Sequence, residues 1–232
     1  PRRLEKILFT RGIRALIIPP DSHAIERLPG FDWSLFAVAS INPATKEGYP
    51  WHSVGTDAYQ NAIEVFSRLR QAGYRKIGLT LPRDYSAREK HGMLGRLLVE
   101  PVIDRQIHAI PPFIYQTDFD DSNNLSAFDK WMKKHQPDVL VCLDNRMWPY
   151  LESQGRRIPD DIGLAHVSLG PDVQGWSGLN RHSQEKGSAA VELLMMQLSQ
   201  NQYGPPKEPR QLLIAGEWVQ GNTTRIPTSS PD

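Results

Sequence analysis

Polar and aromatic side chains that could bind a small molecule follow several apolar runs of this sequence. Asp144 and Asn145 come directly after the apolar run at 139–143, and parallel sheets build their binding sites at such strand ends. A carboxylate there can accept two sugar hydroxyls, although it could instead cap the helix expected after it. Aromatic faces stack on the C–H surfaces of sugars, and core packing is the alternative for each ring. Three aromatic residues lie in predicted loops near strand ends: Tyr85, Trp148 and Trp176.

The same sequence offers little that could perform catalysis. Residues 175–178 read Gly-Trp-Ser-Gly, one residue short of a nucleophile elbow, and no Gly-x4-Gly-Lys-Ser/Thr phosphate loop occurs. The histidines show no metal-ligand spacing such as His-Glu-x-x-His. Cys142 lies within an apolar run, which favours a buried and unreactive thiol. We therefore expect a binding protein with no catalytic residue, no metal and no cofactor.

Short apolar runs alternate with amphipathic segments along most of the chain. The runs predict buried parallel strands at 12–18, 35–41, 76–81, 139–143, 162–167 and 210–215. Helices are predicted near 88–99, 124–135, 146–154 and 184–198, a glycine-rich loop at 170–178 and a turn at 216–218. This alternation predicts an α/β fold with mostly parallel sheets, doubly wound by right-handed crossovers.

The helix expected after Asp57 has the clearest pattern. Thr56 or Asp57 can cap its first N–H groups, and Gly73 can end it in a left-handed conformation. Its apolar residues recur at helical spacing and predict one buried face: Ala58, Ala62, Val65, Phe66 and Leu69.

Bulk composition suits a soluble globular protein of one large domain or two smaller ones. The chain has 232 residues, 39% of them hydrophobic and 23% charged. A net charge of +1 gives no general case for DNA binding by this chain. The single cysteine favours a reducing compartment, and no apolar run approaches the length of a membrane span. We therefore expect a cytoplasmic protein that does not insert in a membrane.

Three motifs in a fixed order resemble the LacI/GalR family of bacterial transcriptional repressors. The first is residues 54–79, from Val-Gly-Thr-Asp to Lys-Ile-Gly-Leu. The second is residues 136–163, from Gln-Pro-Asp-Val through Asp144 to Ile-Pro-Asp-Asp-Ile-Gly. The third is residues 176–194, from Trp-Ser-Gly-Leu-Asn into the helix that contains Gly187. The resemblance covers nearly the whole chain.

The resemblance implies a periplasmic-binding-protein-like core of type I, made of two Rossmann-like lobes with parallel sheets. It places the N-terminal lobe at 1–74 and 178–205 and the C-terminal lobe at 75–177 and 206–225. The N-terminal lobe is expected to lack its first β-α-β unit, and residues 226–232 to form a disordered tail. A homodimer is implied, with a small-molecule effector in the cleft between the lobes. DNA contact would need an N-terminal helix-turn-helix, which is absent from this chain.

The resemblance also suggests effector contacts, with departures from the family pattern. Arg88 stands one residue out of register with an arginine that binds effector hydroxyls, and a solvated surface arginine is the alternative. Ser168 replaces an effector-binding aspartate, Leu143 replaces an asparagine, and Tyr74 replaces a histidine. Arg181 occupies a pocket-facing position, where it could bind an anionic effector such as a sugar acid or form a salt bridge across the hinge.

These observations favour the effector-binding and dimerisation core of a LacI-type regulator that senses a sugar or sugar acid. A periplasmic sugar-binding protein of a transporter has the same fold and is the alternative. An α/β enzyme is a third reading, for which the sequence supplies no nucleophile, metal site or nucleotide loop.

Overall fold

The computed structural model describes most of the chain in two compact units. It describes residues 1–20, 27–42, 50–88, 91–108, 110–116 and 118–227, except for the side chains of 86–88. Unit 1 comprises Pro1–Asp57 and His182–Ile214, and unit 2 comprises Ala58–Arg181 and Ala215–Asp232.

Unit 1 is built on a parallel sheet of four described strands. The order is β1 (Ala15–Ile18), β2 (Ala37–Ile41), β3 (His52–Thr56) and β9 (Gln211–Ile214). Helix α8 (Ser183–Ser199) packs on β1, β2 and β3. Strand alternation sends Ala37 and Ala39 toward Ala190 and Leu194 of α8, while Val38 packs on the other face with Phe36 and Trp51. The described part of this unit also contains α1 (Arg2–Thr10) and the 3₁₀ turn η1 (Trp33–Leu35).

Unit 2 is built on a six-stranded sheet, mostly parallel. The order is β10 (Glu217–Val219), β8 (Ser177–Asn180), β7 (Gly163–Leu169), β6 (Val139–Cys142), β4 (Ile77–Pro82) and β5 (Phe113–Tyr115). Only the pairing of β10 with β8 is antiparallel among these described strands. The central strands are buried along their length, which explains their continuous apolar sequences.

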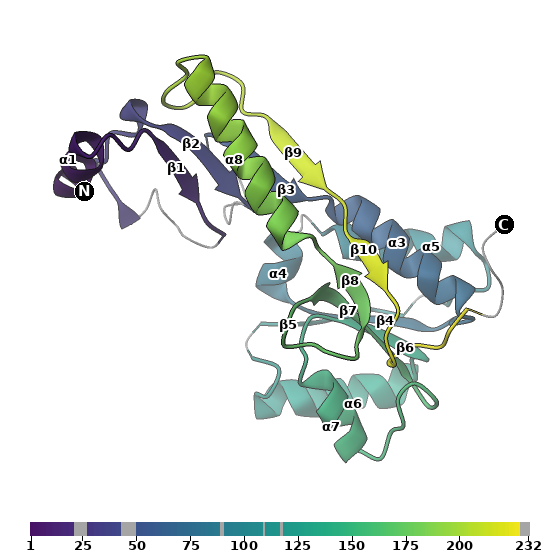
Figure 1. The fold of residues 1–232 in the computed structure, drawn as a ribbon. Coiled ribbons are helices and arrows are strands. Elements are labelled where there is room, and N and C mark those ends of the chain that lie inside the picture. The colour runs from purple at the N-terminus through teal and green to yellow at the C-terminus, as the bar shows by residue number, and fades with distance from the viewer. Residues whose placement is uncertain (21–26, 43–49, 89–90, 109, 117, 228–232) are drawn as a thin grey trace. The chain divides into compact units, whose positions relative to one another are not determined.

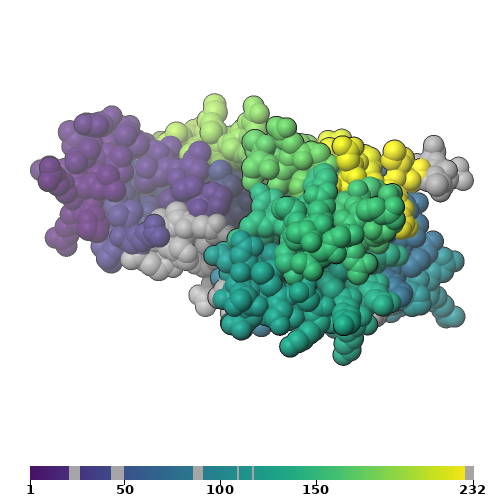
Figure 2. Space-filling model, turned by 90° about the horizontal axis from the view of Figure 1, so that it is seen from below, coloured from purple at the N-terminus to yellow at the C-terminus, as the bar shows by residue number. Residues whose placement is uncertain are grey.

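Helices cover both faces of the unit 2 sheet (Figure 1). Helices α3 (Ala58–Gln71) and α5 (Gly92–Ile103) lie on one face, and α6 (Ser122–His135) and α7 (Met147–Ser153) lie on the other. Figure 2 shows the teal to green atoms of α6 and α7 from outside the sheet. The short helix α4 (Arg83–Arg88) follows β4 directly. The predicted α/β fold with parallel-rich sheets is confirmed.

The buried face predicted for helix α3 and its predicted end at Gly73 are both confirmed. Its buried residues include Ala62, Val65, Phe66 and Leu69. Gly73 has a φ of 83°, and the Tyr74 amide donates to the Leu69 carbonyl at 3.1 Å. A left-handed residue at this point costs glycine little, so the chain turns sharply from α3 into β4.

The unit boundaries differ from those implied by the resemblance. Helix α3 belongs to unit 2, because it packs on α5, β8 and β10. Residues 178–181 belong there too, because β8 pairs with β7. Strand β9 instead belongs to unit 1, where it pairs in parallel with β3.

Several local predictions also need correction. Residues 217 and 218 of the predicted turn belong to strand β10, and the predicted loop at 170–178 ends inside β8, because the two strands pair with each other. The helix predicted at 88–99 is two helices, α4 and α5. Helix α1 was not predicted, and its Leu8 packs against the cluster of Phe36 and Trp51. The predicted tail overlaps residues 228–232, which lie outside the described residues.

No described helix is both long enough and apolar enough to cross a membrane.

Candidate functional site

A hollow of about 460 Å³ lies at the carboxyl edge of the unit 2 sheet. We call it the carboxyl-edge hollow. Strands β4, β5 and β6 end at it, which is where parallel α/β sheets place their ligands. It is lined by Pro82, Tyr115, Asp118, Leu143, Asp144, Asn145 and Arg146.

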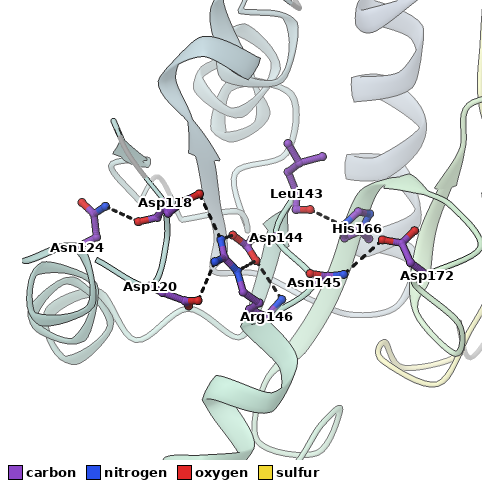
Figure 3. A network of polar contacts seen from close by, with 9 residues as sticks. All are labelled: Asp118, Asp120, Asn124, Leu143, Asp144, Asn145, Arg146, His166 and Asp172. Carbon is purple, nitrogen blue, oxygen red and sulfur yellow. Dashed lines mark hydrogen bonds and ion pairs between the residues drawn. The ribbon is translucent and has the colours of Figure 1, made fainter. Parts of the chain in front are cut away.

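Arg146 is the centre of the polar network at this edge (Figure 3). Its Nε donates to Asp144 Oδ1 at 2.8 Å, its Nη2 to Asp144 Oδ2 at 2.6 Å, and its Nη1 to Asp120 Oδ2 at 2.7 Å. Asp118 approaches at 3.9 Å. The hydrogen bonds that Arg146 donates to Asp144 are the main cause of its raised pKa. A guanidinium is therefore held in place between carboxylates, with 41% of its side chain still exposed.

Asp144 holds Arg146 in place and lines the carboxyl-edge hollow. Its Oδ1 accepts the Arg146 backbone N–H at 3.0 Å, but Arg146 is itself the N-cap of α7 and no described side chain caps that helix, so the predicted capping contact is not made. The Asp144 carboxylate also lines the carboxyl-edge hollow. Oδ1 already accepts two hydrogen bonds from Arg146, whereas Oδ2 accepts one and keeps a further lone pair for a ligand hydroxyl. Asn145 is exposed and donates to Asp172 Oδ2 at 3.4 Å, so its amide is only loosely held.

His166 links the ends of β6 and β7. Its Nε2 lies 2.5 Å from the Leu143 carbonyl, and its Nδ1 accepts the Ser168 backbone N–H at 3.2 Å. These partners suit the neutral tautomer with the proton on Nε2. Burial lowers the pKa of His166, which keeps the ring neutral near pH 7. Ser168 is only partly exposed, and its position is fixed through its backbone.

The aromatic candidates are packed more deeply than the sequence analysis expected. Trp176 is 5% exposed, and its ring meets those of Trp148 and His166 edge to face, with centroids 5.6 and 5.3 Å apart. Tyr85 is 7% exposed. Trp148 is half-buried in the same cluster as Trp176. This burial favours the core-packing alternative for Trp176 and Tyr85, and effector binding by the three aromatic residues stays a prediction.

The two arginine candidates have different outcomes. Arg181 is buried and donates from Nη1 to the Tyr85 hydroxyl at 3.0 Å, with its guanidinium carbon 5.8 Å from the ring centroid. It is held within unit 2, and effector binding by it stays a prediction. Arg88 ends helix α4, and its side chain lies outside the described part of the chain.

Sequence reasoning missed four residues of this edge. Arg146 follows Asp144 by two positions, and that Asp-Asn-Arg run was the available signal for a fork. Asp118 and Asp120 come from the loop after β5, which only the fold brings to β6. Tyr115 ends β5, and burial raises the pKa of its hydroxyl.

Chemical reactivity is low in this part of the molecule. Burial raises the pKa of the Cys142 thiol, so it stays protonated. Across the described ranges, no three His, Cys, Asp or Glu side chains gather in a way that could hold a metal ion. The network can bind and orient hydroxyl groups, and it presents no activated nucleophile.

No family model matches this sequence, and no curated protein sequence matches it. Solved structures do match. The transcription regulator CcpA of Lactococcus lactis is 14% identical with a TM-score of 0.67, and the match covers 97% of this chain and 83% of that one. A LacI family transcriptional regulator from Enterococcus faecium, solved with ribose, is 15% identical with a TM-score of 0.66, covering 98% and 85%. The chain shares its fold with LacI-family regulators.

A third structure with this LacI-type fold is a regulator from Weissella paramesenteroides solved with glucose. It is 13% identical with a TM-score of 0.65, and the match covers 99% of this chain and 83% of that one. The LacI-type, periplasmic-binding-protein-like fold implied by the three sequence motifs is confirmed. Identities of this size establish the fold alone, so function rests on the residues of the site.

Proposed function

We propose that this chain is the effector-binding core of a LacI-type transcriptional regulator and that its effector is a neutral sugar. The observation that carries the proposal is the Asp144–Arg146 pair in the carboxyl-edge hollow of a LacI-type fold. A fixed guanidinium donates to sugar oxygens, and the carboxylates beside it accept from sugar hydroxyls. Ribose and glucose in two structures of the same fold support a carbohydrate.

Charge around Arg146 favours a neutral sugar over a sugar acid. Asp118, Asp120 and Asp144 carry three carboxylates against one guanidinium. A ligand carboxylate placed here would meet more negative than positive charge. The sugar acid considered from the sequence is therefore the weaker choice for this hollow.

The rest of the proposal concerns the whole regulator. We infer a homodimer in the cytoplasm that contacts DNA through a helix-turn-helix outside this chain. Effector binding would shift the populations of two arrangements of the lobes. Binding in a cleft between the lobes stays a prediction. Sequencing the gene upstream of residue 1 tests this: a helix-turn-helix there would support the proposal, and a signal peptide would support the alternative of a periplasmic sugar-binding protein.

The binding step is tested by thermal shift and calorimetry against a panel of sugars and sugar acids. By mass action, a sugar at 100 times its Kd should raise the free energy of unfolding by roughly 2.7 kcal/mol, and the thermal midpoint should rise with it. Asp144→Asn removes the negative charge with little change of shape and should weaken that sugar at least tenfold. Asp160→Asn, on an exposed aspartate before β7, is the matched control and should bind as wild type.

Two outcomes would reject the proposal. If no neutral sugar stabilises the chain, or if Asp144→Asn and Asp160→Asn bind the sugar equally well, the hollow is not the effector site. Turnover of a sugar derivative that disappears in Asp144→Asn would instead support an enzyme.

A further inference from the structure

A second hollow of about 460 Å³ lies at the opposite edge of the unit 2 sheet. We call it the amino-edge hollow. Lys76, Asp138 and Ile162 line it, and they stand just before the parallel strands β4, β6 and β7. The carboxyl-edge hollow lies where β4 and β6 end, so the two hollows lie at opposite ends of these strands.

Basic side chains dominate the amino-edge hollow. Arg75 and Lys76 come from the turn between α3 and β4, His108 from the segment before β5, and Arg156 from the segment after α7. Three connections far apart in sequence therefore bring cations or potential cations to one concave surface.

Both carboxylates of the hollow already have partners. Asp138 accepts the backbone N–H groups of Arg75 at 2.8 Å and Lys76 at 2.9 Å, one on each oxygen. Asp161 accepts from Arg157 through its backbone N–H at 2.9 Å and its Nη2 at 2.8 Å. That arginine lowers the pKa of Asp161 to about 2, so the carboxylate stays ionised and paired at neutral pH.

The basic side chains, in contrast, keep N–H donors that no described residue accepts. Within the described residues, the Lys76 ammonium, the Arg156 guanidinium and the His108 ring make no hydrogen bond or ion pair. The Arg75 guanidinium is held by Gln106 Oε1 at 3.1 Å and by the carbonyls of Arg70 and Tyr74. Its Nε and Nη1 are engaged there, which orients the group without neutralising it.

We propose that the amino-edge hollow binds a phosphoryl group of a small phosphorylated metabolite. Lys76 supplies a point charge and Arg156 a planar fork, a combination that suits a doubly charged oxyanion. Arg75 adds a fixed positive charge beside them. Met132, Pro137 and Ile162 also line the hollow and offer apolar surface to the organic part of the ligand. This site does not depend on sugar binding at the carboxyl-edge hollow.

A structural role for the same cations is the competing explanation. Helices α3 and α6 end near this edge of the sheet, at Gln71 and His135, and basic side chains stabilise the negative ends of helices. In that case Lys76 and Arg156 would raise stability without recognising any anion. Phosphate would then act on the protein only as an excluded salt, which stabilises folded proteins in general.

The test measures binding of inorganic phosphate and of glucose 6-phosphate by calorimetry and thermal shift at constant ionic strength. Glucose and chloride are the neutral and monovalent comparisons. We expect saturable binding of the phosphate-bearing probes and at least tenfold weaker binding by the double variant Lys76→Gln/Arg156→Gln. The matched control is Arg3→Gln/Lys207→Gln, which removes two exposed cations from unit 1 and should bind as wild type.

Comparing inorganic phosphate with glucose 6-phosphate identifies which kind of ligand the hollow binds. Binding of both probes supports a phosphorylated metabolite. Tighter binding of glucose 6-phosphate that is kept in Asp144→Asn but lost in Lys76→Gln/Arg156→Gln shows that the organic part is bound at the amino-edge hollow. Binding of inorganic phosphate alone restricts the site to the free ion and overturns the metabolite.

The proposal is overturned if phosphate gives no saturable response, or if the double variant and its control respond equally. Arg156→Gln alone, on an exposed segment, replaces the double variant if that variant does not fold. Asp144→Asn should keep its phosphate response, which separates failure of this site from failure of the sugar site.

Discussion

The Arg146 guanidinium donates to both carboxylate oxygens of Asp144, from Nε at 2.8 Å and from Nη2 at 2.6 Å. A two-residue separation in sequence thus gives a bidentate fork at the end of β6. The pair is partly open to solvent, so it adds little to stability, and its value lies in the fixed orientation of its donors and acceptors.

Arg146→Lys should separate binding from stability. Lysine keeps the charge but cannot reproduce the planar fork, so the sugar affinity should fall about tenfold. The free energy of unfolding should change by less than about 1 kcal/mol, because the side chain is 41% exposed. Calorimetry and urea unfolding measure the two effects. Arg157→Lys removes a similar fork to Asp161 outside the carboxyl-edge hollow and should leave affinity unchanged; equal losses in both variants would contradict the assignment.

Arg96→Leu should destabilise unit 2 strongly. Glu100 is fully buried, and Arg96 Nε donates to its Oε1 at 2.5 Å, while Arg70 lies 3.5 Å from its Oε2. Removing Arg96 leaves a buried carboxylate with a single distant partner, which costs roughly 3–5 kcal/mol. Urea unfolding measures the loss. Arg68→Leu breaks an ion pair of the same helical spacing to Glu64, but a half-exposed one, and should cost less than about 1 kcal/mol.

His166 should make stability depend on pH in the acidic range. Burial lowers its pKa in the folded state below the ordinary value of 6.5, so the unfolded chain takes up a proton first as pH falls. Stability is therefore fully present above that value and decreases below it, until the folded state is protonated as well. His52 has a lowered pKa and acts in the same direction. His166→Gln should reduce the loss of unfolding free energy between about pH 7 and pH 5.5, and an unchanged pH dependence would contradict the prediction.

Gly163→Ala should destabilise the start of β7. A Cβ at Gly163 would overlap the Tyr74 ring, with Cζ only 2.6 Å away, and the Tyr74 hydroxyl is held by the Arg225 backbone N–H at 3.0 Å. Relieving that overlap costs about 1–3 kcal/mol by thermal or urea unfolding. Gly187→Ala in α8 meets nothing within 4 Å and should instead stabilise by about 0.5–1 kcal/mol. A neutral result at Gly163 would show that Tyr74 can move aside.

Local patterns determined which segments become helices and strands. Val65, Phe66 and Leu69 lie on one helical face by spacing alone, and Gly73 ends that helix because a left-handed turn favours glycine. The strand at 139–142 is apolar throughout because both faces of a parallel strand are buried. The position of Asp144 at a strand end, and so its place in a binding edge, follows from the same pattern.

Only the tertiary structure decided which strands pair and which side chains meet. Strand β9 pairs with β3 although more than a hundred residues separate them, and β10 pairs with β8 across several tens of residues. No local sequence pattern specifies such pairs. The same holds for Asp120 with Arg146, and for Lys76 with Arg156 at the other edge. Burial of Trp176 and Tyr85 also depends on what packs over them. Sequence spacing determines which face of an element is apolar, whereas the chain's long-range contacts determine which charges and rings meet.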